Sequence, residues 1–310
     1  MARTQLIIDC DPGVDDAIAL LLALASPAEI EVIAITTVSG NVGAELTARN
    51  ACIIREIAHR EDVPIYLGAA QPLVRPPVGA SDFHGASGLG DYRLFEPKIG
   101  LAKGRAALAI IEEVMRRPAG AVKLAVTGPM TNIALALRLA PEIAPRLAGI
   151  VAMGGASLAG GNITPMAEYN IFADPHAAHV VFASGVPITL HGLDLTHQVR
   201  ATPQHSAAIR TIGTRQAAAM ADFMDFSIGV RRARGDLEGA PMHDPCTIAW
   251  LLRPELFSTR PADIKIDIAP GPAFGHTEVV SEPKGPANAQ WAIKADAEGF
   301  FALVSERLSK

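Results

Sequence analysis

The sequence predicts an α/β fold with an open, mainly parallel, Rossmann-like sheet flanked by helices. Short apolar runs of strand length alternate with longer helical patterns through the first two-thirds of the chain. This rhythm is typical of parallel sheets, because the connections between parallel strands place helices on both faces. Polar loops follow several of the apolar runs, and sheets of this kind bind ligands at the carboxyl ends of their strands.

Each element is predicted from its own pattern. The expected strands are Leu6–Ile8, Glu31–Val38, Ile65–Leu67, Val122–Val126, Ile150–Met153 and Ile188–Leu190, with short later ones at Ile264–Ile268, Thr277–Val280 and Gln290–Ile293. The expected helices are Asp15–Ala25, Ala44–His59, Ala106–Arg116, Asn132–Leu139, Pro175–Ala183, Pro203–Ile228, Cys246–Leu252 and Glu298–Leu308. The long Gly- and Pro-rich segment 68–104 is a candidate lid. No repeat or linker interrupts the pattern, so we expect one domain over residues 1–310.

Composition narrows the classes of function. Of 310 residues, 49% are hydrophobic, which is ample for a large core, and the net charge of −5 provides no basic surface for nucleic acid. No apolar run is long enough to span a bilayer, and no leader is expected before the first strand. Three widely spaced cysteines, Cys10, Cys52 and Cys246, suit reduced thiols. We therefore expect a cytoplasmic protein with neither a nucleic-acid nor a membrane partner.

The stretch from Asp9 to Asp16 (DCDPGVDD) places four carboxylates at a strand-to-helix corner. A helix N-terminus favours one or two acidic residues, but four repel one another unless some bind a cation or a proton. Ligands that are all oxygen indicate a hard cation, Ca²⁺ or Mg²⁺. We expect Asp11 and Asp16 to reach this cation, and Asp15 to point at a water from which it can take a proton.

Two later segments offer further oxygen ligands. Asp244 lies in a short polar break, HDP, before an apolar helix, where it is either a remote ligand of the cation or the N-cap of that helix. The backbone carbonyl of Thr127, in a Thr-Gly-Pro turn, is another candidate.

Other polar residues indicate recognition of a sugar and a leaving group. Segment 162–170 supplies Asn162, Glu168 and Asn170, which suit either vicinal hydroxyls or a solvated loop. Asn41, in a Ser-Gly-Asn turn, is a turn residue or a ligand contact. Among nine histidines, His84 and His243 lie in Gly-rich or polar loops, where a histidine can protonate a leaving group near neutral pH.

These motifs together resemble the inosine–uridine preferring nucleoside hydrolase family. The octet at 9–16 strongly resembles the N-terminal signature of that family. The resemblance covers nearly the whole chain, in matching order, through SGNVG at 39–43, HG and GLG within 84–90, TGPMTN at 127–132, MGG at 153–155, GNITP at 161–165, EYN at 168–170 and HDP at 243–245.

The resemblance implies Ca²⁺-dependent hydrolysis of the N-glycosidic bond of ribonucleosides, which releases free base and ribose. It implies that Asp11, Asp16, Asp244 and the Thr127 carbonyl hold the ion. Asp15 matches the general base of the family, and His243 matches the histidine that assists departure of the base.

The resemblance also implies how the substrate is held. Asn41, Asn162, Glu168 and Asn170 match the residues that bind ribose, Met153 packs against the sugar, and His84 faces the nucleobase. A homodimer or homotetramer is implied as the assembly. Because the ion and buried amides recognise the sugar hydroxyls, we expect 2′-deoxynucleosides to be poor substrates.

The sequence does not determine which nucleobase is preferred. The stretch 223–232 lacks the tyrosine that members favouring pyrimidines tend to carry there. Phe223 and Phe226 are predicted to pack in the core. Arg231 and Arg232 either form a solvated face or approach the base.

Three other functions are weighed against this one. The nearest is hydrolysis of another N-riboside, such as nicotinamide riboside. A haloacid-dehalogenase-like phosphatase would use Asp9 and Asp11, but Gly13 stands where that fold requires Thr or Ser. A non-catalytic nucleoside-binding protein would not need both Asp15 and His243.

Overall fold

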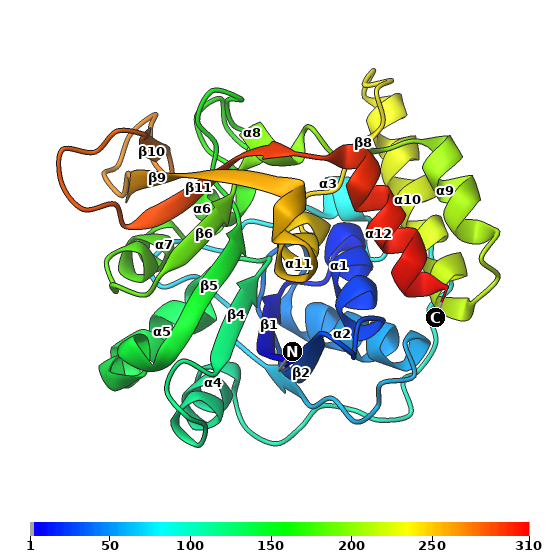
Figure 1. Cartoon of the computed structure of the whole chain (residues 1–310), viewed down its shortest axis with the longest axis horizontal. Coiled ribbons are helices and arrows are strands. Elements are labelled where there is room, and N and C mark those ends of the chain that lie inside the picture. The colour runs from blue at the N-terminus through cyan, green and yellow to red at the C-terminus, as the bar shows by residue number, and fades with distance from the viewer. Residues whose placement is uncertain (1–2, 310) are drawn as a thin grey trace.

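One nine-stranded sheet runs through the computed structural model, which describes residues 3–309 (Figure 1). Its order is β10-β9-β11-β6-β5-β4-β1-β2-β3. Pairing is parallel from β3 across to β11, and only β9 and β10 run antiparallel to their neighbours. The strands are β1 (Thr4–Cys10), β2 (Ile30–Thr37), β3 (Ile65–Leu67), β4 (Val122–Val126), β5 (Leu147–Met153), β6 (Ile188–His191), β9 (Phe257–Ile266), β10 (Thr277–Val280) and β11 (Ala289–Ala295). The predicted open, mainly parallel sheet is confirmed.

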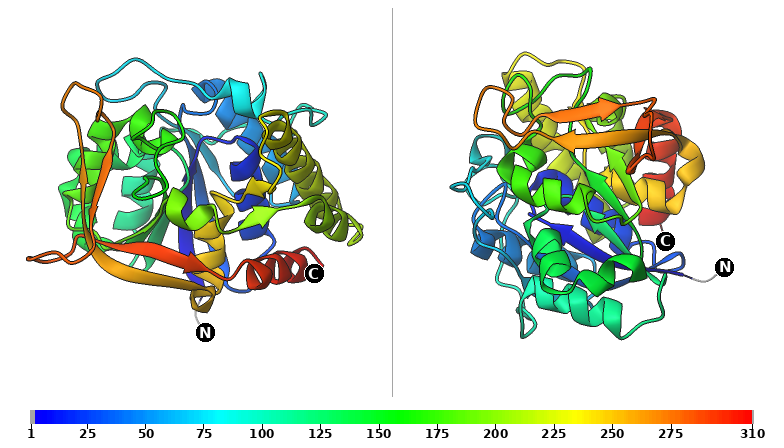
Figure 2. Two further views of the ribbon diagram at one scale, coloured as in Figure 1. Left: turned by 90° about the horizontal axis from the view of Figure 1, so that it is seen from above. Right: turned by 90° about the vertical axis from the view of Figure 1, so that its left-hand side faces the viewer.

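Helices cover the sheet on both sides (Figure 2). They are α1 (Val14–Leu24), α2 (Ala44–Ile57), α3 (Ser81–His84), α4 (Ala106–Met115), α5 (Thr131–Leu139), α6 (Tyr169–Ala173), α7 (Pro175–Phe182), α8 (Leu193–Thr196), α9 (Pro203–Arg210), α10 (Arg215–Ala233), α11 (Pro245–Leu252) and α12 (Ala297–Leu308). Short 3₁₀ turns lie at Pro141–Arg146 and Pro254–Leu256, and a small ribbon pairs β7 (Arg200–Ala201) with β8 (Ala240–Pro241).

The single helix expected over Pro203–Ile228 is wrong, because the chain breaks between α9 and α10. Gly213 adopts a φ of 79°, which ends the first helix. Thr214 then caps the second, since its Oγ1 accepts a hydrogen bond from the Ala217 N–H at 3.1 Å.

The central strand β1 is buried on both faces, which explains why its apolar residues form a continuous run instead of alternating with polar ones. Leu6 and Ile8 pack in a cluster with α1, α2, α10, α11 and α12, whereas Ile7 packs on the opposite face with α4, α5 and α7. Successive side chains of a strand point to opposite faces, so a strand buried on both sides is apolar throughout.

This arrangement brings the loops after β1, β2, β4 and β5 to one edge of the sheet. Segment 68–104 contains α3 and joins the same region. It is tied down by Tyr169, whose Oη donates to the Val78 carbonyl at 2.7 Å, and by Asp174, which accepts from the Leu73 N–H at 2.8 Å. None of the helices within residues 3–309 has the length and apolarity needed to cross a membrane.

The packing predicts the cost of a cavity in this core. Leu21 on α1 is fully buried, so Leu21→Ala should lower the free energy of unfolding by about 2–5 kcal/mol. Leu108 on α4 is 57% exposed, and Leu108→Ala should stay within about 0.5 kcal/mol of the parent. Urea titration of both variants checks the difference. Equal losses would show that α1 does not form the buried layer described.

Candidate active site

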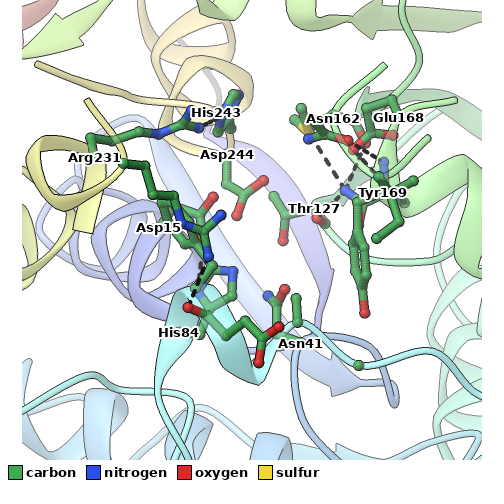
Figure 3. A pocket seen from close by; sticks show the side chains of 18 residues that line it. Asp15, Asn41, His84, Thr127, Asn162, Glu168, Tyr169, Arg231, His243 and Asp244 are labelled. Carbon is green, nitrogen blue, oxygen red and sulfur yellow. Dashed lines mark hydrogen bonds and ion pairs between the residues drawn. The ribbon is translucent and has the colours of Figure 1, made fainter. Parts of the chain in front are cut away.

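A cavity of about 250 Å³ opens at the edge of the sheet where these loops meet (Figure 3). Most of the residues predicted to form the site line it: Asp15, Asn41, His84, Thr127, Met153, Asn162, Glu168, Asn170, His243 and Asp244. The other two, Asp11 and Asp16, are fully buried and bond to residues of its wall. The strand-to-helix corner and the later loops therefore build a single site.

Asp16 is held firmly at the start of α1. Its Oδ2 accepts hydrogen bonds from the Gly13 N–H at 3.0 Å and from Asn41 Nδ2 at 3.1 Å, and its Oδ1 accepts from Thr127 Oγ1 at 2.7 Å. Asp11 accepts from the Asn41 N–H at 2.7 Å through Oδ2. Its Oδ1 is buried and has no hydrogen-bond partner within the described chain. A buried carboxylate oxygen of this kind is suited to a cation.

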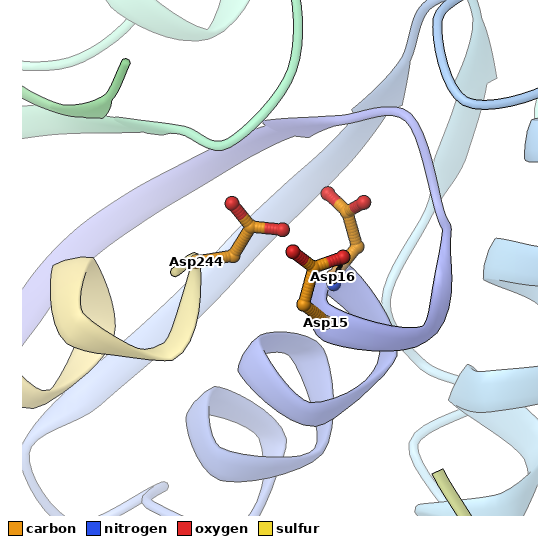
Figure 4. A group of neighbouring side chains, drawn as sticks. All are labelled: Asp15, Asp16 and Asp244. Carbon is orange, nitrogen blue, oxygen red and sulfur yellow. Dashed lines mark hydrogen bonds between the residues drawn. The ribbon is translucent and has the colours of Figure 1, made fainter. Parts of the chain in front are cut away.

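Three carboxylates form a group that can hold a metal ion (Figure 4). Asp15, Asp16 and Asp244 each offer an oxygen, and these oxygens lie within 4.8 Å of one another. The structure thus places Asp15, expected as the proton acceptor, directly beside the expected ligands. The ligand role of Asp11 stays a prediction.

Burial and the charges of neighbouring carboxylates raise the pKa values of Asp11, Asp16 and Asp244. Desolvation raises the pKa of Asp16 to about 7, and the charge of Asp15 adds to it. The pKa values of Asp11 and Asp244 are also raised, first by desolvation and then by neighbouring carboxylates. A divalent cation removes this repulsion, and a donor set made only of oxygens fits a hard ion. The acidic cluster is therefore chemically suited to a metal ion.

The fourth carboxylate of the octet, Asp9, does a different job. Its Oδ1 accepts from Thr36 Oγ1 at 2.6 Å and from Asn132 Nδ2 at 2.8 Å. Burial raises the pKa of Asp9 to about 7. Asp9 thus ties β1 to β2 and α5 outside the cavity wall.

Glu168 caps the N-terminus of α6 at the far side of the cavity. Its carboxylate accepts from the N–H groups of Gly155, Asn170 and Ile171 at 2.9, 3.0 and 3.2 Å. Desolvation raises its pKa to about 7, and these three donors oppose that effect. The carboxylate is fixed where it can face a substrate rather than move with solvent.

The three predicted asparagines are oriented by their own hydrogen bonds. Asn170 Nδ2 donates to the Thr127 carbonyl at 2.7 Å, and Asn162 Oδ1 accepts from the Tyr169 N–H at 2.8 Å. Asn41 Nδ2 donates to Asp16 and to the Asp11 carbonyl, so this amide positions the aspartates. The Thr127 carbonyl keeps a second lone pair for another partner.

The hydrogen bonds define the protonation of both candidate histidines. The Val14 N–H donates to His84 Nδ1 at 3.2 Å, so this nitrogen carries no proton. At His243, Arg231 Nη2 lies 3.4 Å from Nε2, and Nδ1 lies 2.8 Å from Thr196 Oγ1. Arginine can only donate, so His243 Nε2 accepts and Nδ1 holds the proton. Desolvation lowers the pKa of both rings, and Arg231 lowers that of His243 further.

Three further residues, to which the sequence patterns assigned no role, also line the cavity: Phe83, Tyr169 and Arg234. Of the two possibilities for the arginine pair, Arg231 approaches the cavity, whereas Arg232 is exposed. No local motif marks Arg231. The available signal was its place near the end of α10, the helix that precedes the HDP turn at 243–245.

The phenylalanines of α10 lie where they were predicted. Phe223 is buried in the core against Tyr92, with ring centroids 5.0 Å apart. Phe226 packs partly buried against the same core and does not line the cavity.

Fold and site together define a nucleoside hydrolase. A sequence model described as "inosine-uridine preferring nucleoside hydrolase" matches residues 6–302. The chain belongs to this family and is an enzyme of that class, which excludes the phosphatase alternative.

Particular relatives support this assignment at the level of whole chains. The pyrimidine-specific ribonucleoside hydrolase RihA of Salmonella gallinarum is 42% identical over 306 residues, which cover 98% of this chain and 97% of the relative. An uncharacterised protein of Schizosaccharomyces pombe is 40% identical and covers 99% of each chain. Among solved structures, a purine-preferring ribonucleoside hydrolase from Gardnerella vaginalis has a TM-score of 0.91 at 34% identity, with 98% of each chain covered.

The close packing around Asp11 predicts that a single methyl group added at Gly40 disturbs the cation site. A Cβ on Gly40 would lie 2.0 Å from Asp11 Oδ2, so Gly40→Ala should displace this carboxylate and weaken Ca²⁺ binding at least about 10-fold. Gly43 has open space at the same position, and Gly43→Ala should bind Ca²⁺ like the parent. Calorimetric titration measures both. Equal affinities would show that Asp11 does not contribute to the ion site.

The raised pKa values predict how Ca²⁺ changes stability with pH. An acid whose folded pKa is about 7 holds more protons when folded, so metal-free protein loses stability as pH rises from about 4 to 7. A divalent cation bound to this cluster would replace those protons, so saturating Ca²⁺ should raise Tm more at pH 8 than at pH 5. Calorimetry with Ca²⁺ and with a chelator tests this, and Asp244→Asn should reduce the difference. The same Tm shift at both pH values would contradict it.

Proposed function

We propose that the chain hydrolyses ribonucleosides to free base and ribose with Ca²⁺ held by the acidic cluster. The observation that carries this proposal is the convergence of buried Asp11, Asp16 and Asp244 with the amides of Asn162 and Asn170 around one cavity. Few chemistries need a buried acidic cluster beside groups that bind vicinal hydroxyls. Membership of the nucleoside hydrolase family supplies the reaction class.

The two sides of the cavity suit the two parts of a nucleoside. In Figure 3, Asp244 and Thr127 lie between Asn162 and Glu168 on one side and His84 and Arg231 on the other. Asp11, Asp16, Asp244 and the Thr127 carbonyl would hold the Ca²⁺ ion, whose positive charge would bind the ribose 2′- and 3′-hydroxyls and orient the attacking water. We therefore place the ribose over Asp244 and Thr127, and the base toward His84.

The residues around the sugar stabilise positive charge on it. Cleavage of an N-glycosidic bond passes through an oxocarbenium-like ribose, as in the hydrolysis of O-glycosides. Glu168, fixed by three N–H donors, presents negative charge where this cation develops. Met153, whose Sδ accepts from Asn170 Nδ2 at 3.4 Å, packs beside the sugar.

Asp15 is the proposed acceptor of the water proton. It lines the cavity, and its Oδ1 accepts from the Asp16 N–H at 3.2 Å, which fixes its position. Asp11 is a second carboxylate that can take this role, because its Oδ1 has no hydrogen-bond partner in the described structure. Matched variants of the two distinguish them.

His243 is the proposed residue that assists departure of the base, because it lines the cavity on the side of Arg231. RihA proteins that are about 42% identical carry the description pyrimidine-specific, which makes pyrimidine ribonucleosides the first substrates to test. Another N-riboside, such as nicotinamide riboside, belongs in the same panel, because the sugar side of the cavity would be unchanged.

We further propose that residues 1–310 act as one domain, assembled as a homodimer or homotetramer in the cytoplasm. The sheet that joins residues 4 to 295 supports a single domain. Three buried free cysteines support a reducing compartment. Light scattering coupled to size-exclusion chromatography measures the assembly, and a monomer would contradict it.

Release of free base measures the activity directly. Uridine, cytidine, inosine, adenosine and nicotinamide riboside should be tested with Ca²⁺ and with a chelator. We expect base release that a chelator abolishes. The rate of release from 2′-deoxynucleosides should be at least about 10²-fold lower, because the protein groups that bind the 2′-hydroxyl are then left unpaired. Binding of a nucleoside without release of its base would instead support a non-catalytic nucleoside-binding protein.

A pair of variants locates the proton acceptor. Asp15→Asn should lower kcat at least about 10²-fold and retain Ca²⁺, because the amide keeps an oxygen ligand. Asp11→Asn should mainly weaken Ca²⁺ binding and recover turnover when the ion is in excess. The reverse pattern, with near-normal kcat in Asp15→Asn and none in Asp11→Asn, would move the role to Asp11.

A further inference from the structure

Asn50, on the buried face of α2, is only 1% exposed and does not line the cavity. Its Nδ2 donates two hydrogen bonds, to the Pro12 carbonyl at 3.0 Å and to the Ser87 carbonyl at 2.8 Å. Because both acceptors are carbonyls, the amide presents its NH₂ group to them and uses both of its protons. An apolar side chain in this place would leave two carbonyls unpaired, so the helix carries an amide here for the sake of its two partners.

The two carbonyls belong to two different segments of the site. Pro12 lies in the acidic corner 9–16, and Ser87 lies in the loop 84–90 that begins at His84. These segments are far apart in the sequence, and each contributes residues to the wall of the cavity. One side chain from a third element therefore joins the two segments.

The backbone of loop 84–90 has few other polar ties to the fold. In the part of the chain that the structure describes, its remaining backbone hydrogen bonds stay within segment 80–92. Only two hydrogen bonds join the loop to other elements: the one from Asn50, and the one from the Val14 N–H to His84 Nδ1 at 3.2 Å. The second ends on a side chain, so Asn50 supplies the hydrogen bond that fixes the loop backbone from outside.

The position of this loop sets the contact between His84 and the acidic corner (Figure 3). His84 Nδ1 lies 3.8 Å from Asp15 Oδ1. The corner passes so close to the ring that a Cβ on Gly13 would lie 2.4 Å from His84 Nδ1. A displacement of about 1 Å within a site packed this closely can lower a rate by about 10²-fold.

We propose that Asn50 is a positioning residue, which holds the His84 loop against the acidic corner that bears Asp15. Turnover then depends on a side chain that lies outside the cavity and touches neither substrate nor the reacting atoms. The inference rests on the proposed function, which supplies the reaction in which the two loops take part.

The acidic cluster does not depend on Asn50 for its own geometry. The side chains of Asp11 and Asp16 accept their hydrogen bonds from other groups, namely those of Gly13, Asn41 and Thr127. Removal of the Asn50 donors should therefore free the loop and leave the affinity for a cation nearly unchanged. This difference separates a positioning role from a general loss of structure.

Hydrogen exchange measured by mass spectrometry tests the loop without any substrate. Asn50→Leu keeps a similar volume but has no donor, so amide exchange in segment 84–92 should be at least about 10-fold faster than in the parent. Exchange in α1 should stay as in the parent. Leu21→Ala, at a buried position of α1, is the control that destabilises the fold and should speed exchange in α1 instead. Unchanged exchange in 84–92, or a uniform rise in every segment, would overturn the inference.

Turnover and ion binding form the second measurement. With Ca²⁺ in excess, Asn50→Leu should lower kcat/KM by about 10- to 10²-fold for whichever nucleoside the parent hydrolyses fastest. Calorimetric titration should give a Ca²⁺ Kd within about 2-fold of the parent, because the ligands lie apart from the amide. Leu21→Ala should keep the parental kcat/KM. A parental kcat/KM in Asn50→Leu would contradict the positioning role.

A double-mutant cycle shows whether Asn50 acts through the loop. His84→Ala should lower kcat/KM by itself, and adding Asn50→Leu to it should cost less than about 2-fold more, because the two changes disturb the same contact. Losses that multiply in the double variant would show that Asn50 acts elsewhere, and would overturn the inference.

Gly88 offers an independent way to disturb the same clasp. A Cβ there would lie 2.7 Å from Asn50 Nδ2 and 3.1 Å from the Pro12 carbonyl oxygen, so Gly88→Ala should reproduce the changes of Asn50→Leu in exchange and in kcat/KM. Gly120 has a similar positive φ, 77° against 87° at Gly88, but open space around its Cβ position. Gly120→Ala therefore controls for backbone strain and should keep the parental kcat/KM. Parental behaviour in Gly88→Ala would contradict the inference even if Asn50→Leu does not fold.

The inference and the proposed function fail in different ways. Base release by the parent, together with unchanged exchange in segment 84–92 of Asn50→Leu, would overturn the inference alone. No base release from any nucleoside by the parent with Ca²⁺ would overturn the proposed function and the effect on turnover, whereas the exchange measurement would still decide whether Asn50 holds the loop.

Discussion

Negative charge buried at the carboxyl ends of β1 and β4 is the constraint on which this site depends. Asp11 and Asp16 are fully buried, and Asp244 nearly so. Amide donors from Asn41 and hydroxyl and N–H donors from the turns orient them, but these neutral partners do not cancel the repulsion. The glycine at 128, where a Cβ would lie 2.4 Å from Asp11 Oδ1, shows how closely the chain surrounds the carboxylates. Only a cation or bound protons can balance them.

The cavity carries charges of both signs. Carboxylates and amides surround the region proposed for the sugar, whereas Arg231 and Arg234 lie over Phe83 toward the end proposed for the base, where Asp82 also lines the cavity. Cleavage of a glycosidic bond separates charge in the same sense, with positive charge on the sugar and negative charge on the base. The field of the site thus favours the separation before any proton moves.

Sequence patterns predicted what depends on neighbours along the chain. The strand–helix rhythm gave the mainly parallel sheet, and the octet located the acidic corner, because strand period and turn chemistry are local. The use of Asn41 to orient aspartates, the role of Asp9 in tying β1 to β2, and the approach of Arg231 to His243 depend on packing across the fold. The break at 211–214 had a local signal in Gly213, which the apolar pattern on both sides obscured. Metal ligation and catalytic roles remain predictions.

The most direct test of this account is the number of protons released when Ca²⁺ binds. Calorimetric titration in buffers of different ionisation enthalpy measures it at pH 6 and pH 9. Because burial raises the pKa of Asp16 to about 7, the account predicts binding of one ion with release of at least about one proton at pH 6, and much less at pH 9. Binding without proton release at pH 6, or no binding, would contradict the claim that a cation balances the buried carboxylates.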